Sequence, residues 1–363
     1  MSTDRPIGIG LLGVTHPHTS GRLRVLLDRD DVRVLGAADD HSVIEPFVKH
    51  FGLRRRTTDE ILVDPEVGAV LIHAKSDQMH ILSVAALRAG KAVLVEKPAG
   101  RKLADLELLA TIADETGGVC QVGYNFRFSE AVAFTERVLA SGVLGDPVQV
   151  RVHGACSMGE AATTHLNQPD DMGGALWVIG SHMVDLILHH FGMPSSVNAR
   201  VPKFEGLFDP GFREDAAAAV LQYPRLLVSL DFTSWDPLPW VEAWNVSVYG
   251  TKGVLHAGPL PARWELFLSR PGLGLPGGWT RWRESSFPVE WSARTTDYSP
   301  ELAEIANREL FQREVDAFLA AVRGEAPVRV TAHHARDIAR LIAACYESSR
   351  HDGREVSLGT SDL

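Results

Sequence analysis

The chain has 363 residues, of which 45% are hydrophobic and 23% are charged, and it carries a formal net charge of −10. This length exceeds what one ordinary hydrophobic core organises, so two domains are expected. The acidic balance argues against nucleic acid or an anionic membrane as a partner. The sequence has no apolar run long enough to cross a bilayer and no secretory leader, and its scattered cysteines form neither a disulfide framework nor a zinc-binding spacing. We therefore expect a cytoplasmic protein.

Residues 1–125 alternate between short apolar runs and amphipathic stretches. Strands are expected at 7–12, 32–39, 67–74, 92–98 and 118–125, and helices at 20–31, 43–52, 80–90 and 103–117. Apolar runs with little polar alternation are typical of parallel strands covered on both faces. The pattern predicts a doubly wound Rossmann domain, a class of α/β fold that binds its ligand beyond the carboxyl ends of the strands.

Residues 126–363 have a different texture, in which strand-like segments alternate apolar and polar residues. Such segments occur at 147–155, 216–224, 226–235 and 244–257, and helices are expected at 129–141, 176–191, 301–323 and 332–350. The alternation favours a mostly antiparallel sheet, so we predict a second α/β domain over this part. The stretch 258–300 is rich in Gly, Pro and Trp and has a loop-like composition.

A literal Gly-x-Gly-x-x-Gly pattern occurs at Gly8, Gly10 and Gly13. A dinucleotide fingerprint must follow a strand and open a helix, because the pyrophosphate binds at the helix N-terminus. Residues 2–6, which would have to form the preceding strand, are polar and end in Pro6, so the first two glycines fall within the strand instead. The strand-to-helix turn is therefore predicted to run from Gly13 to Gly21, with Gly13 at the tight turn.

This predicted turn departs from a standard phosphate loop. Thr15 and His18 stand where the second and third glycines are usual. The Thr15 hydroxyl could donate to a phosphate. His16 and His18 could contact phosphate or substrate, or could simply be polar surface residues.

An acidic residue expected of a dinucleotide site is present at the end of the second strand. Asp39 is placed there to accept the ribose hydroxyls of NAD. Asp40 beside it would repel a 2′-phosphate. NAD is therefore expected as the cofactor in preference to NADP.

The fourth predicted strand ends in Glu96-Lys97-Pro98, which places a charged pair at the edge where parallel sheets bind ligands. A lysine at this edge can bind a substrate hydroxyl, or accept its proton when burial and neighbours lower the pKa of the amine. The simpler interpretation is a salt bridge at a strand end.

A wider pattern accompanies that charged pair. Residues 89–98, AGKAVLVEKP, reproduce the A-G-K-x-V-x-x-E-K-P motif of the Gfo/Idh/MocA oxidoreductases, and the segments 122–128, 173–185 and 344–356 resemble further motifs of that family. The chain thus resembles this family, which includes glucose–fructose oxidoreductase and inositol dehydrogenase, over nearly its whole length. The resemblance implies a Rossmann domain followed by an α/β domain with a large, mostly antiparallel open sheet. That sheet often serves oligomerisation, so a homodimer or homotetramer is expected.

The resemblance also implies a reaction: hydride transfer between NAD and a carbinol carbon of a sugar, cyclitol or related polyol. It makes Lys97 and His182 the expected catalytic residues. In the family's T-P-x-x-x-H loop, Ser76 replaces the proline and His80 is expected to open the following helix. The expected cofactor-binding residues are Gly13, Thr15, His16, His18, Asp39, Ser76, His80, Glu96 and Lys97. The expected substrate-binding residues are Lys97, Arg127, Asp171, His182 and Asp185, and none is assigned to a metal.

One departure from the family's motifs leaves more than one activity compatible with the sequence. The family motif D-x-G-x-H ends at His182, but its aspartate is replaced by Val178, whose side chain cannot orient an imidazole or bind a hydroxyl. Asp170 or Asp171 could supply the missing carboxylate, which keeps the dehydrogenase interpretation. A second interpretation is a relative that binds NAD without net turnover, either a redox-neutral enzyme or a ligand sensor. A third is a metal-dependent hydrolase or isomerase with the ligands His165, Asp170, Asp171, His182 and His189, although these lack a typical local spacing.

Overall fold

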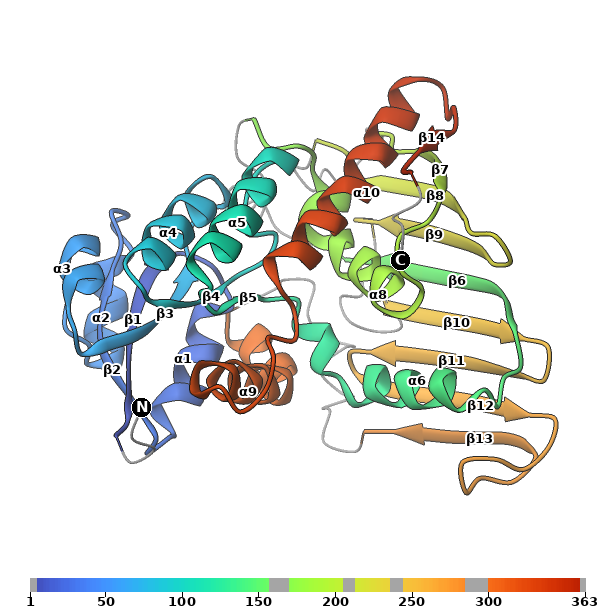
Figure 1. The fold of residues 1–363 in the computed structure, drawn as a ribbon, viewed down its shortest axis with the longest axis horizontal. Helices are drawn as coiled ribbons and strands as arrows, with labels where there is room; N and C mark the ends of the chain where they lie inside the picture. Colours follow the sequence, from blue (N-terminus) through green and yellow to red (C-terminus); the bar gives the residue numbers. More distant parts are fainter. Residues whose placement is uncertain (1–4, 157–169, 205–212, 236–243, 285–299, 360–363) are drawn as a thin grey trace. The chain divides into compact units, whose positions relative to one another are not determined.

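The computed structural model of the chain describes residues 5–156, 170–204, 213–235, 244–284 and 300–359 (Figure 1). Its contacts divide it into two compact units. The first consists of Met1–Tyr124, Thr164–Met172 and Ser299–Ala339, and the second of Asn125–Thr163, Gly173–Tyr298 and Arg340–Leu363. The sequence predicts a single division after residue 125. In the structure, the first unit also includes two later segments, residues 164–172 and 299–339.

The first unit is built on the predicted parallel sheet, which has five strands in the order β2-β1-β3-β4-β5. Its strands are β1 (Ile7–Val14), β2 (Val32–Ala38), β3 (Val67–His73), β4 (Ala92–Val95) and β5 (Cys120–Val122). Its helices are α1 (Thr19–Leu27), α2 (Ile44–Phe51), α3 (Thr58–Val63), α4 (Ser76–Arg88), α5 (Leu103–Thr116) and α9 (Pro300–Arg323). Figure 1 shows helices on both faces of this sheet, with α1 and α9 on one face and α4 and α5 on the other.

Helix α9 joins the first unit because it completes the hydrophobic core there. Phe311, Val315 and Phe318 of α9 pack in one buried cluster with Ile9 of β1 and Leu71 of β3. Burying such side chains removes a large apolar area from water, which stabilises the helix on the sheet despite its distance along the chain. The family-like N-terminal domain is therefore incomplete without residues from near the C-terminus.

Two local boundaries differ from the sequence predictions. Strand β1 continues through Gly13 to Val14, so Gly13 lies in a strand irregularity and the turn itself is formed by residues 15–18. The φ of Gly13 is +79°, and a Cβ at this position would lie 2.5 Å from Ala74. Both observations require glycine here. Helix α4 begins at Ser76 and not at His80, which places His80 in its second turn.

The second unit contains a nine-stranded sheet in the order β13-β12-β11-β10-β6-β9-β8-β7-β14. Its strands are β6 (Pro147–Ala155), β7 (Ser196–Arg200), β8 (Ala216–Gln222), β9 (Leu227–Thr233), β10 (Trp244–Gly250), β11 (Gly253–Pro259), β12 (Ala262–Leu268), β13 (Gly278–Arg283) and β14 (Val356–Ser357). Strands β6 and β9 pair in parallel and the other neighbours pair antiparallel, which confirms the predicted large, mostly antiparallel sheet.

The prediction of a loop over 258–300 is wrong where β12 and β13 lie. Residues of β12 alternate between buried and half-buried positions, and Trp264 of β12 pairs with Trp282 of β13. The aromatic residues that gave this stretch its unusual composition are good strand formers. Residues 285–299 of the same stretch lie outside the described residues.

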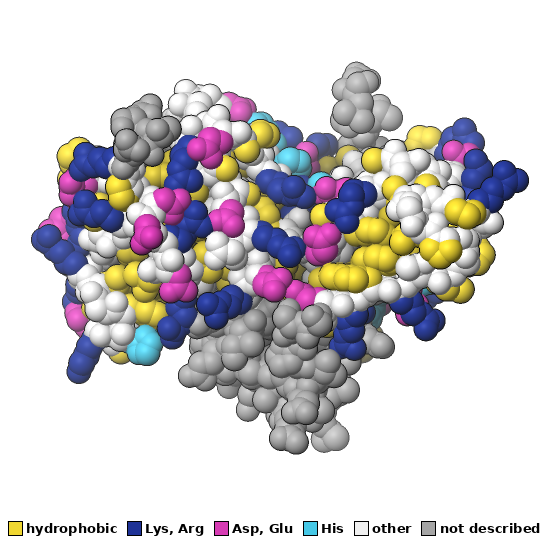
Figure 2. All heavy atoms as spheres, turned by 90° about the horizontal axis from the view of Figure 1, so that it is seen from below, with side chains coloured by type: hydrophobic (Ala, Val, Ile, Leu, Met, Phe, Trp, Pro, Cys, Tyr) yellow, Lys and Arg dark blue, Asp and Glu magenta, His cyan; other side chains and the backbone are white. Residues whose placement is uncertain are grey.

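The helices of the second unit are α6 (Glu130–Ser141), α8 (Ser181–Phe191) and the end of α10 (Ala332–Arg350), with a 3₁₀ turn at Asn125–Phe128 and a π-helical turn at Leu176–Gly180. The π-helical turn precedes α8, where the sequence predicts one regular helix over 176–191. Within the described part of the chain, no helix combines the length and apolar character that a bilayer crossing requires. Figure 2 shows acidic and basic side chains mixed over one face of the molecule.

Candidate cofactor and catalytic site

Four strands of the first unit carry predicted site residues at their carboxyl ends. The turn of residues 15–18 follows β1, Asp39 follows β2, Ser76 follows β3, and the pair 96–97 follows β4. Because parallel strands end at one edge of the sheet, the structure gathers these residues along a single edge. This is the edge at which doubly wound sheets bind nucleotides.

Asp39 is held in place by two backbone amides. The Val14 amide donates to Oδ2 over 2.7 Å, and the His41 amide donates to Oδ1 over 2.8 Å. A carboxylate can accept about four hydrogen bonds, so these contacts orient Asp39 without exhausting it as an acceptor. Asp39 therefore keeps the acceptor capacity that a ribose hydroxyl would require.

The phosphate end is built differently. The His16 amide donates to the His73 carbonyl over 3.1 Å, and the Thr19 amide donates to the His16 carbonyl over 3.0 Å. The His18 amide donates to Nδ1 of the His16 ring over 3.1 Å. In a standard phosphate loop such amides face the pyrophosphate, whereas here they close the turn on itself. The Thr15 hydroxyl, 3.4 Å from the His73 carbonyl, also contributes to this closure.

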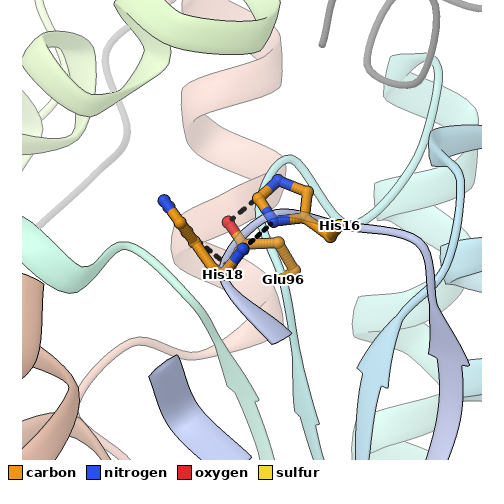
Figure 3. A group of neighbouring side chains, drawn as sticks. All are labelled: His16, His18 and Glu96. Carbon is orange, nitrogen blue, oxygen red and sulfur yellow. Dashed lines mark hydrogen bonds and ion pairs between the residues drawn. The ribbon is translucent and has the colours of Figure 1, made fainter. Parts of the chain in front are cut away.

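Two residues of the turn, His16 and His18, form a buried cluster with Glu96 (Figure 3). Nδ1 of His18 lies 3.2 Å from Oε2 of Glu96, and Nε2 of His16 lies 3.9 Å from Oε1. Arg22 also donates to Glu96. Burial alone would raise the pKa of Glu96, but the charge of Arg22, followed by those of His16 and His18, outweighs burial and holds that pKa well below its usual value.

These contacts fix which ring nitrogens carry protons. An ionised carboxylate only accepts hydrogen bonds, so Nδ1 of His18 is the donor toward Glu96. In a neutral imidazole the other nitrogen, Nε2 of His18, is then an acceptor. His16 has the opposite tautomer, because its Nδ1 accepts the His18 amide and its Nε2 carries the proton that faces Glu96.

The same cluster has the spacing of a metal site, since its candidate ligand atoms lie within 4.8 Å of one another. Its chemistry opposes that use. Nδ1 of His18 and Nε2 of His16 direct protons, and not lone pairs, toward Glu96, and the Arg22 guanidinium already donates to Oε2 of this carboxylate. The geometry is that of a buried ion-pair cluster.

The ligands of the metal-hydrolase interpretation are not gathered in the part of the chain that the structure describes, where the cluster around Glu96 is the one such group of three. His165 lies outside the described residues. Asp171 accepts from the Ser76 hydroxyl over 3.0 Å, and Nε2 of His189 pairs with Glu136 at 2.6 Å.

Arg22 links this cluster to helix α9. Its Nε lies 2.6 Å from Oε2 of Glu314, its Nη1 lies 3.3 Å from Nε2 of His73, and Arg22 and Glu314 are fully buried. Burial raises the pKa of Glu314, an effect that the neighbouring Arg22 reduces but does not cancel. Sequence reasoning missed Arg22 and Glu314, since no local pattern connects them.

The remaining predicted residues of the first unit have the following surroundings. Lys97 is buried directly after β4, with 2% of its surface exposed. Ser76 and Asp171 are bonded to each other, both buried. Nε2 of His80 lies 3.6 Å from Oδ1 of Asp105, and burial lowers the pKa of His80 more than Asp105 raises it. The structure thus gives His80 a protein partner.

In the second unit, Arg127 and Asp185 bind each other. Nε of Arg127 lies 2.8 Å from Oδ2 of Asp185 and Nη2 lies 2.6 Å from Oδ1, and both side chains are buried. In this bidentate ion pair, two side chains that the resemblance assigns to substrate binding satisfy each other's charge. His182 stacks on Phe126 with ring centroids 4.4 Å apart. Phe126 was not predicted as a site residue.

Glu214 binds the start of the helical segment that carries His182. Its carboxylate accepts from the Gly174 amide over 2.6 Å, the Leu176 amide over 3.1 Å and the Tyr346 hydroxyl over 2.6 Å. Such contacts satisfy the exposed amides at a helix start. Val178 lies in the π-helical turn at residues 176–180 and is fully buried. Because it is a valine, it supplies no carboxylate at this position.

Comparison with known families gives two matches that together span most of the chain. Residues 7–124 match the family model described as the oxidoreductase family, NAD-binding Rossmann fold. Residues 137–358 match the model of the oxidoreductase family, C-terminal alpha/beta domain.

Individual proteins are similar over part or all of the chain. The scyllo-inositol 2-dehydrogenase (NADP(+)) IolW of Bacillus subtilis (strain 168) is 30% identical over 143 residues, 39% of this chain and 40% of that protein. The trans-1,2-dihydrobenzene-1,2-diol dehydrogenase of Bos taurus is 30% identical over 254 residues, 68% of this chain and 72% of that protein. The chain thus spans about two fifths of the Bacillus relative.

Among solved structures, an oxidoreductase from Agrobacterium radiobacter in complex with NAD+, L-tartaric acid and magnesium superimposes with a TM-score of 0.78. It is 18% identical, and the match covers 97% of this chain and 98% of that one. At this identity the likeness shows a shared fold.

Proposed function

Because the chain belongs to the Gfo/Idh/MocA oxidoreductase family, we propose that it is an NAD-dependent dehydrogenase acting on a secondary alcohol of a sugar, cyclitol or related polyol. The observation that carries the proposal is a buried lysine, Lys97, at the nucleotide-binding edge of the sheet that also presents Asp39. The Bacillus and bovine relatives are named for an inositol and a diol, compounds with hydroxyl groups on neighbouring carbons.

Each side chain has a defined task in this proposal. Asp39 accepts the ribose hydroxyls, and Lys97 binds the reacting hydroxyl and takes its proton. When bound, the nicotinamide supplies the group that accepts the hydride. Asp171, fixed by Ser76, is proposed to contact the substrate as the carboxylate that position 178 lacks.

We propose NAD in preference to NADP on electrostatic grounds. A 2′-phosphate at the end of β2 would face the carboxylates of Asp39 and Asp40. Two of the three arginines at 54–56 are engaged elsewhere: Arg55 pairs with Glu45, and Arg56 lies 2.8 Å from Asp64. The Bacillus relative is named for NADP(+), so the preference needs its own test.

A second candidate is a relative that binds NAD without net dehydrogenase turnover. Two observations favour it: the buried Val178 in place of an acid, and a phosphate turn whose amides at His16, His18 and Thr19 are already engaged. Such a protein would be a redox-neutral enzyme or a ligand sensor.

We also propose a homodimer or homotetramer. The support is the family resemblance, together with the exposed side chains of Trp279 and Trp282 on β13, an edge strand of the large sheet. Light scattering on the purified protein tests this, and a monomer at micromolar concentration would contradict it.

The deciding experiment has two stages. Titration with NADH and NADPH, followed by nicotinamide fluorescence, is expected to give saturable NADH binding that is clearly tighter than NADPH binding. A screen of inositols, sugars and cyclic diols with NAD then measures nicotinamide reduction. Turnover supports the dehydrogenase, whereas tight NADH binding with no turnover on any polyol favours the second candidate.

A further inference from the structure

Two of the segments that resemble family motifs meet in the second unit, at Gly173 and Tyr346. The Tyr346 ring, near the end of α10, lies so close to the backbone that a Cβ at Gly173 would be 1.8 Å from the tyrosine hydroxyl. A Cβ at Gly174 would be 2.9 Å from Oε2 of Glu214. Glycine at both positions therefore leaves the room that Tyr346 and Glu214 occupy at the start of the following helical segment.

Glu214 holds the backbone amides at that start. Its carboxylate accepts from the amides of Gly174 and Leu176. Its backbone carbonyl accepts from the Ala175 amide over 3.2 Å. Tyr346 donates its hydroxyl to Oε1 of the same carboxylate over 2.6 Å. Three successive amides at a helix start, where intrahelical acceptors are lacking, are thus bound by one residue from a distant part of the chain.

The pair of Glu214 and Tyr346 is buried, which makes each partner depend on the other. Burial raises the pKa of Tyr346 well above its usual value, and Glu214 raises it further, so the hydroxyl remains a donor. Burial also raises the pKa of Glu214, while the hydrogen bonds from Tyr346 and from the two amides on its carboxylate lower it. Loss of the Tyr346 hydroxyl would therefore weaken the acceptor that binds the start of the helix.

The π-helical turn Leu176–Gly180 joins this start to α8, and His182 lies in the first turn of α8. Turns of this kind are rare, contain one residue more than an α-helical turn and occur often at functional sites. Rewinding the turn to α geometry would rotate the residues beyond it by about 100° relative to the start. The His182 ring would then lose its stacking contact with Phe126.

We propose that Glu214, held by Tyr346, is a positioning residue that fixes the π-helical turn and thereby the orientation of the His182 imidazole. The inference rests on the proposed dehydrogenase, in which His182 is an expected catalytic residue. The residues that carry it all belong to the second unit, so the orientation of His182 is set within that unit.

Tyr346→Phe and Glu214→Gln test this positioning. The first removes the hydroxyl and keeps the ring, and the second keeps the size of the side chain but turns one acceptor into a donor. Both are expected to lower kcat by about 10- to 100-fold, the effect of a small misplacement of a catalytic group. KM and the affinity for NADH should stay within about threefold.

Tyr223→Phe is the matched control. It removes a hydroxyl that donates to the Gly192 carbonyl over 2.8 Å, at the opposite end of α8. This substitution should leave kcat unchanged. A fall in kcat with Tyr346→Phe alone then identifies an effect at the start of the helical segment.

NMR of the His182 imidazole gives a readout that needs neither substrate nor cofactor. Its signals are identified by their loss in His182→Ala. We expect them to shift in Tyr346→Phe and to stay unchanged in Tyr223→Phe. A merely structural contact predicts lower stability in Tyr346→Phe, with kcat and the His182 signals unaltered at temperatures where the variant is folded. That result would overturn the inference.

The other outcomes also decide. If Tyr346→Phe keeps kcat within about threefold of the unsubstituted enzyme, the inference is wrong. A fall in kcat with unmoved His182 signals overturns it as well, because the effect would not pass through His182. If one of the two variants does not fold, the other gives the answer. If the unsubstituted protein oxidises no polyol, the proposed function has failed, and the His182 signals decide the positioning by themselves.

Discussion

Nε of Arg22 in helix α1 lies 2.6 Å from Oε2 of Glu314 in helix α9, although 292 positions separate the two residues. The same guanidinium donates to Glu96 at the end of β4. One buried cation thus connects a helix from each end of the chain with the strand that precedes Lys97. Through Arg22, helix α9 is thus connected to the end of β4, which belongs to the sheet edge where a cofactor is predicted to bind.

Arg22→Met is expected to destabilise the protein by about 3–5 kcal/mol, because it leaves two buried carboxylates without their cation. Urea unfolding followed by circular dichroism measures the change. Arg5→Met is the matched control, since it removes an ion pair to Glu66 in which both side chains are exposed. That substitution should cost no more than about 1 kcal/mol. Equal losses for the two variants would contradict the assignment.

Lys97→Met and His182→Ala are each expected to abolish measurable turnover while NADH affinity stays within about threefold, because the family resemblance assigns each of these residues to catalysis at the substrate hydroxyl. Steady-state kinetics and fluorescence titration give the two quantities. Lys102→Met, on an exposed side chain, and His189→Ala, on the same helix as His182, are controls that should leave kcat unchanged. Unaltered turnover in either principal variant would remove that residue from the reaction.

Asp39→Asn should weaken NADH binding by roughly tenfold or more, because it removes a charged acceptor for the ribose. It should weaken NADPH binding less, since the same change also removes a repulsive charge. The ratio of the two dissociation constants is the measured quantity. Asp40→Asn is the control, with a smaller expected effect because its carboxylate is not held toward the end of β1. A ratio unchanged by Asp39→Asn would argue against a ribose contact.

Asp185→Asn tests whether the buried pair with Arg127 is structural. The substitution removes the charge that pairs with a buried guanidinium, so we expect a stability loss of several kcal/mol, with KM nearly unchanged at temperatures where the variant is folded. Thermal unfolding and kinetics on the same preparation separate the effects. A large rise in KM with unchanged stability would restore the substrate-binding role.

Metal analysis of the purified protein tests the interpretation of the cluster around Glu96. Because Nδ1 of His18 and the Arg22 guanidinium both donate to Oε2 of Glu96, and the proton on Nε2 of His16 faces Oε1, no stoichiometric transition metal is expected, and dialysis against a chelator should leave turnover unchanged. A stoichiometric metal lost together with activity would instead support a metal-dependent enzyme.

Several features of the cofactor edge could be predicted from local sequence. The alternation of apolar runs and helices indicated the parallel sheet, and the polar residues before Gly8 excluded the literal glycine motif. Asp39 and Lys97 were found because residues that directly follow parallel strands reach one edge of the sheet. The extension of β1 through Gly13 was missed because a strand irregularity leaves no periodic signal.

By itself, the sequence determined the family, the two kinds of sheet and the residues at the strand ends, since these follow from short-range patterns of polarity and from motifs. Only the tertiary structure decided which charges meet. Arg22 with Glu314, Arg127 with Asp185, and Ser76 with Asp171 are pairs whose partners lie far apart in the chain. Side-chain contacts of this kind depend on packing in three dimensions, and no sequence period encodes them. The same packing assigned a proton to each ring in the Glu96 cluster and so distinguished His18 from His16.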